Sequence, residues 1–480
     1  MNNKLARQGL LWSTIERLGT QAIQLLLMLY LGRVLGPSSF GYVGMLTLFL
    51  SLAQVLIDSG FSAALIRKSE RTEKDYSTVF IFNICLSILI YIVLYCLSSY
   101  IALFYQIPLL ESLLDILALT VIANGLTLIP KIQLTVDVNF KIQAKSSLIA
   151  ITSSSVIAIT LAALGYGVWT LVFQSLSYSV INCIVLNIYN PWYPKEKFCY
   201  ETFKKLFSFS SNLLIAGVLE AFYSNIYQLI IGKFFTPQLV GQFTQANQIS
   251  SVPAMTLTNI IQRVTYPLFC NIYNGKGKID DAYLNTLKIA GVVVFPILLG
   301  IGLISKPLVS VLLGSEWKFT SDILFLLCIA FMIYPIHAIN INILQVHGRS
   351  DLFLRLEILK KTLMTIILVI TMQININAMV IGLVLHSYLS WFLNGLFSQK
   401  VSTITIRKQL KELLPIWCLC LISGLGSNYI INEISMEPLL NIIFTILLNA
   451  IIYITLIRIM YKEIFMTIIS LIKIRAENER

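Results

Sequence analysis

The chain has 480 residues and a formal net charge of +12 at pH 7, and 57% of its residues are hydrophobic while only 12% are charged. Its mean hydropathy is +0.81. This composition excludes an ordinary soluble protein, because a soluble domain has no core large enough for so much apolar side-chain area. We therefore expect lipid to surround most of the chain.

Long apolar runs follow one another from Leu10 to Met460 and leave no room for a separate soluble domain. A helix needs about 20 residues to cross roughly 30 Å of hydrocarbon. The pattern predicts an all-α integral membrane protein with 14 spans. The first span is not a cleaved signal, since Glu16 and Arg17 interrupt it. The predicted spans are residues 10–32, 42–66, 78–104, 112–131, 147–165, 168–190, 209–234, 242–269, 287–313, 322–346, 354–373, 376–398, 411–431 and 438–460.

Basic residues gather in every second connection between the predicted spans, beginning with Arg67 and Lys68. The remaining connections are acidic or neutral, as at residues 433–437. Because cytoplasmic loops of membrane proteins carry an excess of Lys and Arg, both termini are expected in the cytoplasm. The same rule accounts for the positive net charge without a nucleic-acid partner. Residues 462–475 are predicted to lie along the inner membrane surface as an interfacial segment.

A short motif at the end of the first predicted span occurs again at the end of the seventh. In each copy a Gly and a basic residue are followed by Pro and then by another Gly at the same spacing. The repeat predicts two six-helix lobes, residues 1–206 and 207–400, related by a pseudo-two-fold axis along the membrane normal. Residues 401–480 add two further helices and the interfacial segment. The two copies are Gly32, Arg33, Pro37 and Gly41, and Gly232, Lys233, Pro237 and Gly241.

Polar side chains recur at steps of three or four residues in the first two spans of each lobe, which places them on one face of each helix. A charged side chain at the centre of a membrane helix costs roughly 2.5 to 3.5 kcal/mol. We therefore predict that the four polar faces enclose one hydrated cavity. The expected substrate-binding residues are Arg17, Gln24, Gln54, Tyr223, Tyr227, Gln248, Asn259 and Arg263. The carboxylates expected to couple ion movement are Glu16, Asp58 and Glu220.

A second interpretation applies to each polar residue taken singly. Hydrogen bonds between membrane helices contribute about 1 kcal/mol each without forming a cavity, and tyrosines in spans commonly pack. The charged residues taken together favour the cavity, since helix packing does not require them. The cysteines lack metal-ligand spacing, so we expect no metal, no cofactor and no catalytic residue. No ATPase motif occurs, and an ion gradient or the substrate gradient is the expected energy source.

Four segments carry a family resemblance: Trp12–Arg17, Leu31–Tyr42, Asp58–Arg67 and Gly232–Gly241. With them the chain resembles the polysaccharide transporter family of the multidrug/oligosaccharidyl-lipid/polysaccharide exporter superfamily, which includes Wzx-type flippases and colanic or teichuronic acid exporters. The resemblance covers the whole layout and does not identify a sugar.

The resemblance implies a flippase in the bacterial cytoplasmic membrane that serves surface polysaccharide biosynthesis. Its substrate would be an oligosaccharide on undecaprenyl pyrophosphate, moved from the cytoplasmic to the outer leaflet by alternating access. The implied partners are membrane lipid, H⁺ or Na⁺, and polysaccharide polymerase or assembly proteins. By analogy, the last two spans would hold the polyprenyl tail.

Two other functions stay open at this point. An ion-coupled small-molecule or multidrug exporter of the same superfamily would have the same layout, and the charges of the predicted cavity discriminate only weakly. A membrane polysaccharide polymerase or ligase would need an outward-facing site, and the predicted outer connections are too short to build one.

Overall fold

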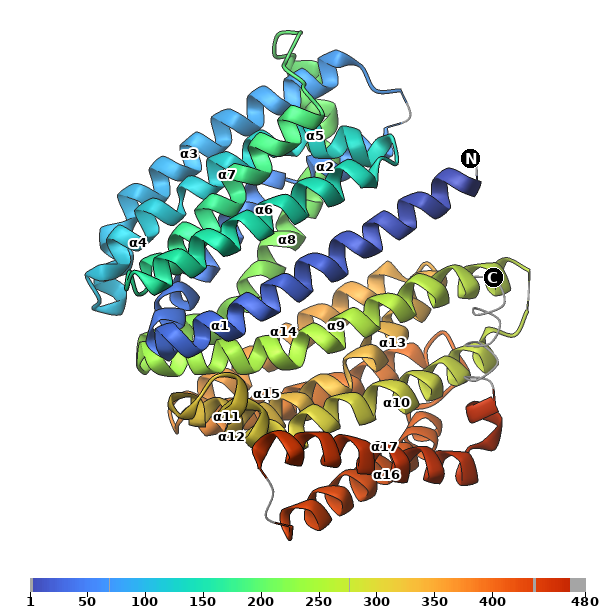
Figure 1. Cartoon of the computed structure of the whole chain (residues 1–480). Coiled ribbons are helices and arrows are strands. Elements are labelled where there is room, and N and C mark those ends of the chain that lie inside the picture. Colours follow the sequence, from blue (N-terminus) through green and yellow to red (C-terminus); the bar gives the residue numbers. More distant parts are fainter. Residues whose placement is uncertain (1–2, 69, 276, 435–436, 467–480) are drawn as a thin grey trace. The chain divides into compact units, whose positions relative to one another are not determined.

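Figure 1 shows the computed structural model of the chain, which describes residues 3–68, 70–275, 277–434 and 437–466. Within these residues every regular element is a helix. The predicted all-α membrane fold is therefore confirmed. The predicted interfacial segment falls largely on residues 467–475, which lie outside the described part.

The chain divides into two compact units, and it passes from one to the other inside helix α9 (Pro237–Asn274). Unit 1 is Met1–Thr244 and unit 2 is Gln245–Arg480. Unit 1 begins with α1 (Asn3–Asp58), which the first copy of the sequence motif divides into two parts. The helices that follow in unit 1 before α9 are α2 (Phe61–Arg67), α3 (Glu73–Tyr105), α4 (Leu109–Leu117), α5 (Leu119–Val136), α6 (Phe140–Ala163), α7 (Trp169–Tyr189) and α8 (Tyr200–Phe234).

Helix α1 changes direction at Gly36, whose φ of 69° and ψ of 171° are not helical. Glycine adopts this conformation without strain because it has no Cβ. Pro37 follows directly and has no N–H with which to continue the hydrogen bonds of the preceding turn. We call residues 3–35 the first arm of α1 and residues 37–58 the second arm. They correspond to the first two predicted spans.

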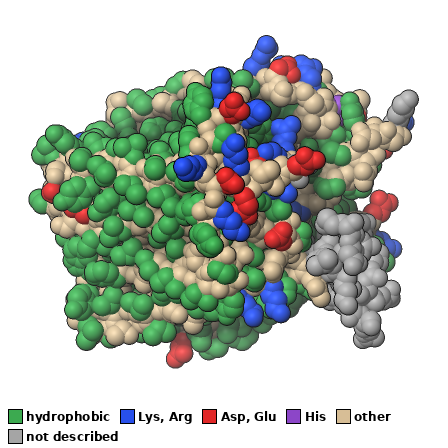
Figure 2. All heavy atoms as spheres, turned by 90° about the horizontal axis from the view of Figure 1, so that it is seen from above, with side chains coloured by type: hydrophobic (Ala, Val, Ile, Leu, Met, Phe, Trp, Pro, Cys, Tyr) green, Lys and Arg blue, Asp and Glu red, His purple; other side chains and the backbone are tan. Residues whose placement is uncertain are grey.

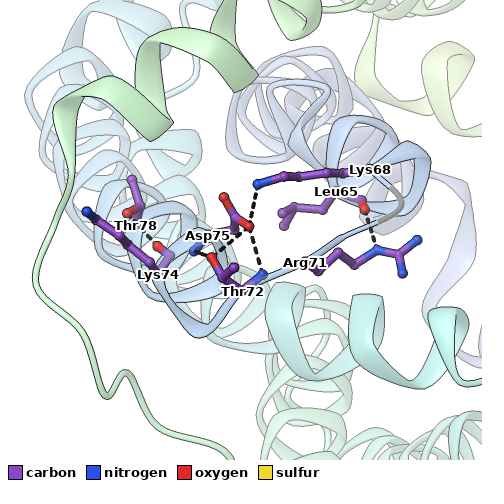
Figure 3. Close-up of polar contacts among 7 residues, drawn as sticks. All are labelled: Leu65, Lys68, Arg71, Thr72, Lys74, Asp75 and Thr78. Carbon is purple, nitrogen blue, oxygen red and sulfur yellow. Dashed lines mark hydrogen bonds and ion pairs between the residues drawn. The ribbon is translucent and has the colours of Figure 1, made fainter.

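Polar contacts fix the start of α3 beside α2 (Figure 3). The Thr72 hydroxyl caps α3, and the Asp75 carboxylate accepts from the Thr72 N–H at 2.8 Å, which completes a capping box. Lys68 Nζ reaches the same carboxylate at 2.6 Å. Arg71 Nε donates to the Leu65 carbonyl at the end of α2, at 2.7 Å. The short connection therefore holds the two helices in a defined orientation.

Unit 2 holds the remaining helices, including the two that the predicted repeat leaves over. The last two, α16 and α17, pack on each other and on α10. Tyr453 of α17 donates to the Val292 carbonyl of α10 at 3.0 Å, and Lys288 of α10 pairs with Glu412 of α16 at 2.7 Å. The helices are α10 (Ile279–Leu303), α11 (Ser305–Leu312), the 3₁₀ turn η1 (Ser315–Trp317), α12 (Lys318–Met332), α13 (Tyr334–Val346), α14 (Ser350–Thr371), α15 (Ile376–Ser398), α16 (Ile406–Asn432) and α17 (Pro438–Met460).

Among the described residues, 11 helical stretches are long and apolar enough to cross a membrane. The first of them, Leu11–Arg67, contains two predicted spans. The long helices α9 and α14 are more polar and are not among the 11, and they account for the other two predicted spans.

Four predicted spans differ from the structure, because each is broken into two helices. In residues 42–66 the break falls at Ser59 and Gly60, which both have positive φ, between α1 and α2. In the other three spans the breaks fall at Ala118, at Ile304 and at Ile333. Pro307 and Pro335 follow the last two breaks closely, in the first turn of a new helix where the missing N–H is tolerated. Nothing in the sequence around Ala118 marks the break there.

Charged side chains are unevenly distributed over the surface. Figure 2 shows one face on which Lys and Arg gather towards one end, while hydrophobic side chains cover most of the rest. Arg67, Lys74, Lys195 and Lys197 are exposed and lie in or beside the connections that precede α3 and α8. This distribution is typical of a multi-pass membrane protein whose charged connections lie in water.

Candidate functional site

The second and seventh predicted spans contact each other inside unit 1. Asn225 Nδ2 of α8 donates to Ser51 Oγ of the second arm of α1 at 3.0 Å. Two turns earlier on α8, Gly217 leaves room for Val55 of the second arm, because a Cβ on Gly217 would lie 2.9 Å from Val55 Cγ1. The second and seventh predicted spans therefore touch along one edge of their polar faces, while Gln54, Glu220 and Ser224 on those faces stay exposed. The sequence did not single out Asn225, which makes the polar contact.

Gln54, one turn along the same arm, is bound from a different direction. Asn124 Nδ2 of α5 donates to Gln54 Oε1 at 2.7 Å, and Gln54 remains exposed. This bond turns the Gln54 carbonyl towards α5 and leaves its NH₂ group as an available donor. Asp58 lies one turn further, and its Oδ1 is buried without a hydrogen-bond partner among the described residues. Burial of an unpaired carboxylate oxygen is costly unless a proton or cation is bound.

The first arm of α1 carries Glu16, Arg17 and Gln24. Ser147 Oγ of α6 donates to Glu16 Oε1 at 2.8 Å, which places Glu16 at the contact between α1 and α6. Arg17 and Gln24 are exposed. Glu16 and Arg17 therefore differ in surroundings although they are neighbours, because successive helical residues point about 100° apart.

The aromatic residues predicted to contact sugar rings lie in α8. Tyr227 is 3% exposed and stacks on Phe243, with ring centroids 5.9 Å apart and planes 15° apart. Tyr223 is half-buried and Glu220 is exposed. In this structure Tyr227 packs within unit 1, and a role for it in binding a sugar stays a prediction.

The remaining three predicted residues lie on the part of α9 that belongs to unit 2. Gln248 and Asn259 are half-buried and Arg263 is exposed. On the same helix, Gln262 Nε2 donates to Asn342 Oδ1 of α13 at 3.3 Å. The relative position of the two units is not determined, so the grouping of all four polar faces around one cavity stays a prediction.

The two copies of the repeated motif lie against each other in unit 1. A Cβ on Gly41 would lie 1.7 Å from the Pro237 carbonyl oxygen, and a Cβ on Gly241 would lie 1.9 Å from the Pro37 carbonyl oxygen. Each glycine thus contacts the proline of the other copy. This reciprocal contact agrees with a two-fold relation between the motifs. The close approach of the two backbones leaves no room for a side chain at either glycine.

Lys233, the basic residue of the second motif, has a structural partner. Its Nζ donates to the Phe104 carbonyl near the end of α3 at 2.5 Å and lies 4.4 Å from the centre of the Phe104 ring. A cation at this place satisfies a carbonyl at a helix C-terminus and interacts favourably with the helix dipole. The motif therefore joins α3 to the start of α9.

No group of three or more His, Cys, Asp or Glu side chains in the described ranges could hold a metal ion. The polar residues that sequence reasoning missed are Asn124, Ser147 and Asn225. Asn124 contacts Gln54, Ser147 contacts Glu16, and Asn225 contacts Ser51 on the same face as Gln54. The two residues of each pair lie far apart in the sequence, so no local sequence pattern predicts these contacts.

Comparison with known proteins agrees with this architecture. The chain is 26% identical to the teichuronic acid biosynthesis protein TuaB of Bacillus subtilis over 73% of each chain. It is 23% identical to the succinoglycan biosynthesis transport protein ExoT of Rhizobium meliloti, over 69% of this chain and 67% of that protein. Its fold is similar to that of the lipid II flippase MurJ in an inward closed conformation, with a TM-score of 0.75, 14% identity, and coverage of 95% of this chain and 99% of the other.

A family model described as polysaccharide biosynthesis protein matches residues 30–322, which include both copies of the repeated motif, all of α8 and α9, and about the first third of unit 2. The match covers more than half of the chain and confirms the resemblance. The protein is a multi-pass membrane protein, and it belongs to the polysaccharide biosynthesis protein family.

Proposed function

We propose that this protein is a flippase that moves undecaprenyl-pyrophosphate-linked oligosaccharide repeat units from the cytoplasmic to the outer leaflet of a bacterial cytoplasmic membrane. Transfer proceeds by alternating access, and both termini lie in the cytoplasm. The product serves O-antigen, capsule or exopolysaccharide synthesis. The observation that carries the proposal is the family match together with a fold shared with a lipid II flippase.

The polar residues suit a pyrophosphate and a glycan. The guanidinium groups of Arg17 and Arg263 are exposed, and planar guanidinium groups bind phosphate oxygens through paired hydrogen bonds. The NH₂ group of Gln54, oriented by Asn124, supplies a neutral donor for a sugar hydroxyl. A sugar-phosphate substrate needs cationic and neutral donors together, and both kinds are present.

Coupling to H⁺ or Na⁺ is assigned to the carboxylates Glu16, Asp58 and Glu220. A buried carboxylate oxygen without a hydrogen-bond donor is stabilised when a proton or cation binds to it. Asp58 has one buried carboxylate oxygen that lacks a hydrogen-bond partner in the described part of the chain. Proton or cation binding there would satisfy that oxygen.

A small-molecule exporter is the alternative from a different substrate class, because the same superfamily layout serves both. One cell-based experiment separates them. Cells that lack their own flippase are given this protein together with the enzymes for a candidate lipid-linked glycan, and the glycan is probed with a membrane-impermeant reagent. We expect the glycan to become accessible at the outer surface and drug resistance to stay unchanged. Drug resistance without exposure of any candidate glycan would overturn the proposal.

A further inference from the structure

The connection between α7 and α8, residues 190–199, joins the two predicted lobes and is fixed to unit 1 near its beginning. Asn190 Nδ2 donates to Gln133 Oε1 of α5 at 3.2 Å. Trp192 Nε1 donates to Glu73 Oε2 of α3 at 3.2 Å, and its ring lies 5.2 Å from that of Phe80. A connection that acted as a free hinge would not have such contacts.

The second half of this connection is fixed by two fully buried hydroxyl groups. The backbone N–H groups of Lys195 and Glu196 both donate to Ser77 Oγ at 3.2 Å. The N–H of Cys199 donates to Thr78 Oγ1 at 3.2 Å. Ser77 and Thr78 are 0% exposed, so these bonds are protected from water. Removal of either hydroxyl would leave buried backbone N–H groups without a partner.

Unit 2 contains a corresponding attachment. The connection between α15 and α16 is bound to Asp280, the second residue of α10, which accepts from Ser402 Oγ at 2.6 Å and from the Thr403 N–H at 3.1 Å. In the predicted repeat, α10 is the counterpart of α3. In both units the connection that follows the sixth span is therefore anchored to the first turns of the third span.

Helix α8 stays in contact with unit 1 from its beginning to its end. Near its start, Phe203 lies 5.9 Å from Phe61 of α2 between ring centres. In its middle, Asn225 binds Ser51, and at its end Lys233 binds the Phe104 carbonyl. A helix held at both ends and in the middle by one unit moves with that unit.

We propose that α8 moves as a rigid part of unit 1, so that the joint used in transport lies inside α9 beyond Thr244 and not in residues 190–199. Pro253 stands in that part of α9, and a proline inside a helix removes one backbone hydrogen bond and favours bending. This inference rests on the proposed alternating-access function, because it specifies which parts of the chain move together.

Two crosslinks test the inference at the two ends of α8. At its beginning, Lys74→Cys is combined with the native Cys199, whose thiol the Lys74 side chain contacts, after the other cysteines are replaced by Ser. Lys74 is exposed, and a cleavable thiosulfonate reagent joins the pair. At its end, Gly44→Cys with Thr244→Cys is oxidised. A Cβ on Gly44 would lie 4.0 Å from the Thr244 Cβ, within the range of about 3.5 to 4.5 Å found in disulfides.

We expect each crosslinked protein to flip lipid-linked glycan in proteoliposomes within about twofold of its reduced form. A loss of tenfold or more that reduction reverses, at either crosslink, would overturn the inference while leaving the proposed function intact. Lys74→Ser with Cys199, treated with the same reagent, is the matched control. Absence of flipping in the reduced and native proteins alike would count against the proposed function itself.

Hydrogen exchange of backbone amides tests, independently of transport, whether residues 195–199 are fixed to α3. The amides of Lys195, Glu196 and Cys199 should exchange at least tenfold more slowly in the native protein than in a Ser77→Ala, Thr78→Val variant. Exchange of the native amides at the rate of an unstructured chain would contradict the inference, whatever the flipping assay shows.

Discussion

Gly41 and Gly241 occupy equivalent positions at the crossing of the two repeated motifs, and each lies against the carbonyl oxygen of the proline in the other motif. The sequence spacing alone indicated a duplication. The structure adds that the two copies pack on each other, and that the second glycine of each copy is what allows the backbones to approach.

Gly41→Ala or Gly241→Ala should destabilise unit 1, because the added methyl group would overlap a backbone carbonyl that cannot move as a side chain can. Overpacking of this kind costs about 1 to 3 kcal/mol or more. Thermal unfolding of the detergent-solubilised protein measures the effect. Gly426→Ala is the control, since a Cβ there would meet nothing within 4 Å. Equal unfolding temperatures for Gly41→Ala and Gly426→Ala would show that the crossing does not need its glycines.

Arg17→Ala and Arg263→Ala should each lower the rate of glycan flipping at least tenfold with normal membrane insertion, because each removes a bidentate donor for phosphate oxygens. Lysine at either position should retain part of the activity, since it keeps the charge and loses the planar geometry. Arg349→Ala is the matched control, because Arg349 is exposed and pairs with Asp351 outside the predicted cavity. Full activity in both alanine variants would remove the cationic-cavity idea.

Glu16→Gln should abolish the dependence of flipping on an imposed ion gradient, because the amide keeps the size and most of the hydrogen bonding of the carboxyl group but binds no proton. Ser147→Ala removes the 2.8 Å hydrogen bond to Glu16 and leaves its carboxylate in place, so the gradient dependence should persist at a reduced rate. The measurement is the flipping rate in proteoliposomes with and without a pH or Na⁺ gradient. A Glu16→Gln protein that still responds to the gradient would exclude Glu16 as the coupling carboxylate.

Cys199 lies in the connection before α8, and hydrogen bonds from the Thr202 side chain and backbone lower the pKa of its thiol to about 7. The thiolate is the reactive form. In a variant with Cys199 as the sole cysteine, the rate of maleimide labelling should therefore rise through pH 7 and level off near pH 8, and Thr202→Val should move this rise to higher pH. A labelling rate that climbs steadily to pH 9 in the parent would contradict the assignment.

The same cysteine tests the predicted sidedness. If residues 190–199 face the cytoplasm, a membrane-impermeant maleimide should label Cys199 in inside-out vesicles and leave it unlabelled in intact cells. The opposite result would reverse the orientation assigned from the loop charges.

Sequence reasoning located the helices well because apolar runs of span length have few alternatives in a membrane. It also placed the direction change of α1, since Gly36 and Pro37 are local signals. It did not find the breaks in four spans, and the break at Ala118 has no proline or glycine to mark it. The partners Asn124, Ser147 and Asn225 were also out of reach, because which faces of distant helices meet is decided by packing.

The most direct test of the central claim uses the purified protein in proteoliposomes that contain a pyrophosphate-linked oligosaccharide in both leaflets. An impermeant reagent modifies the glycan of the outer leaflet, and the fraction modified is followed over time. We predict that modification proceeds past the outer-leaflet share towards completion with the native protein, and stops at that share in protein-free vesicles and with Arg17→Ala, Arg263→Ala combined. Modification that stops at the outer-leaflet share with the native protein, for every candidate glycan, would contradict the assignment as a lipid-linked oligosaccharide flippase.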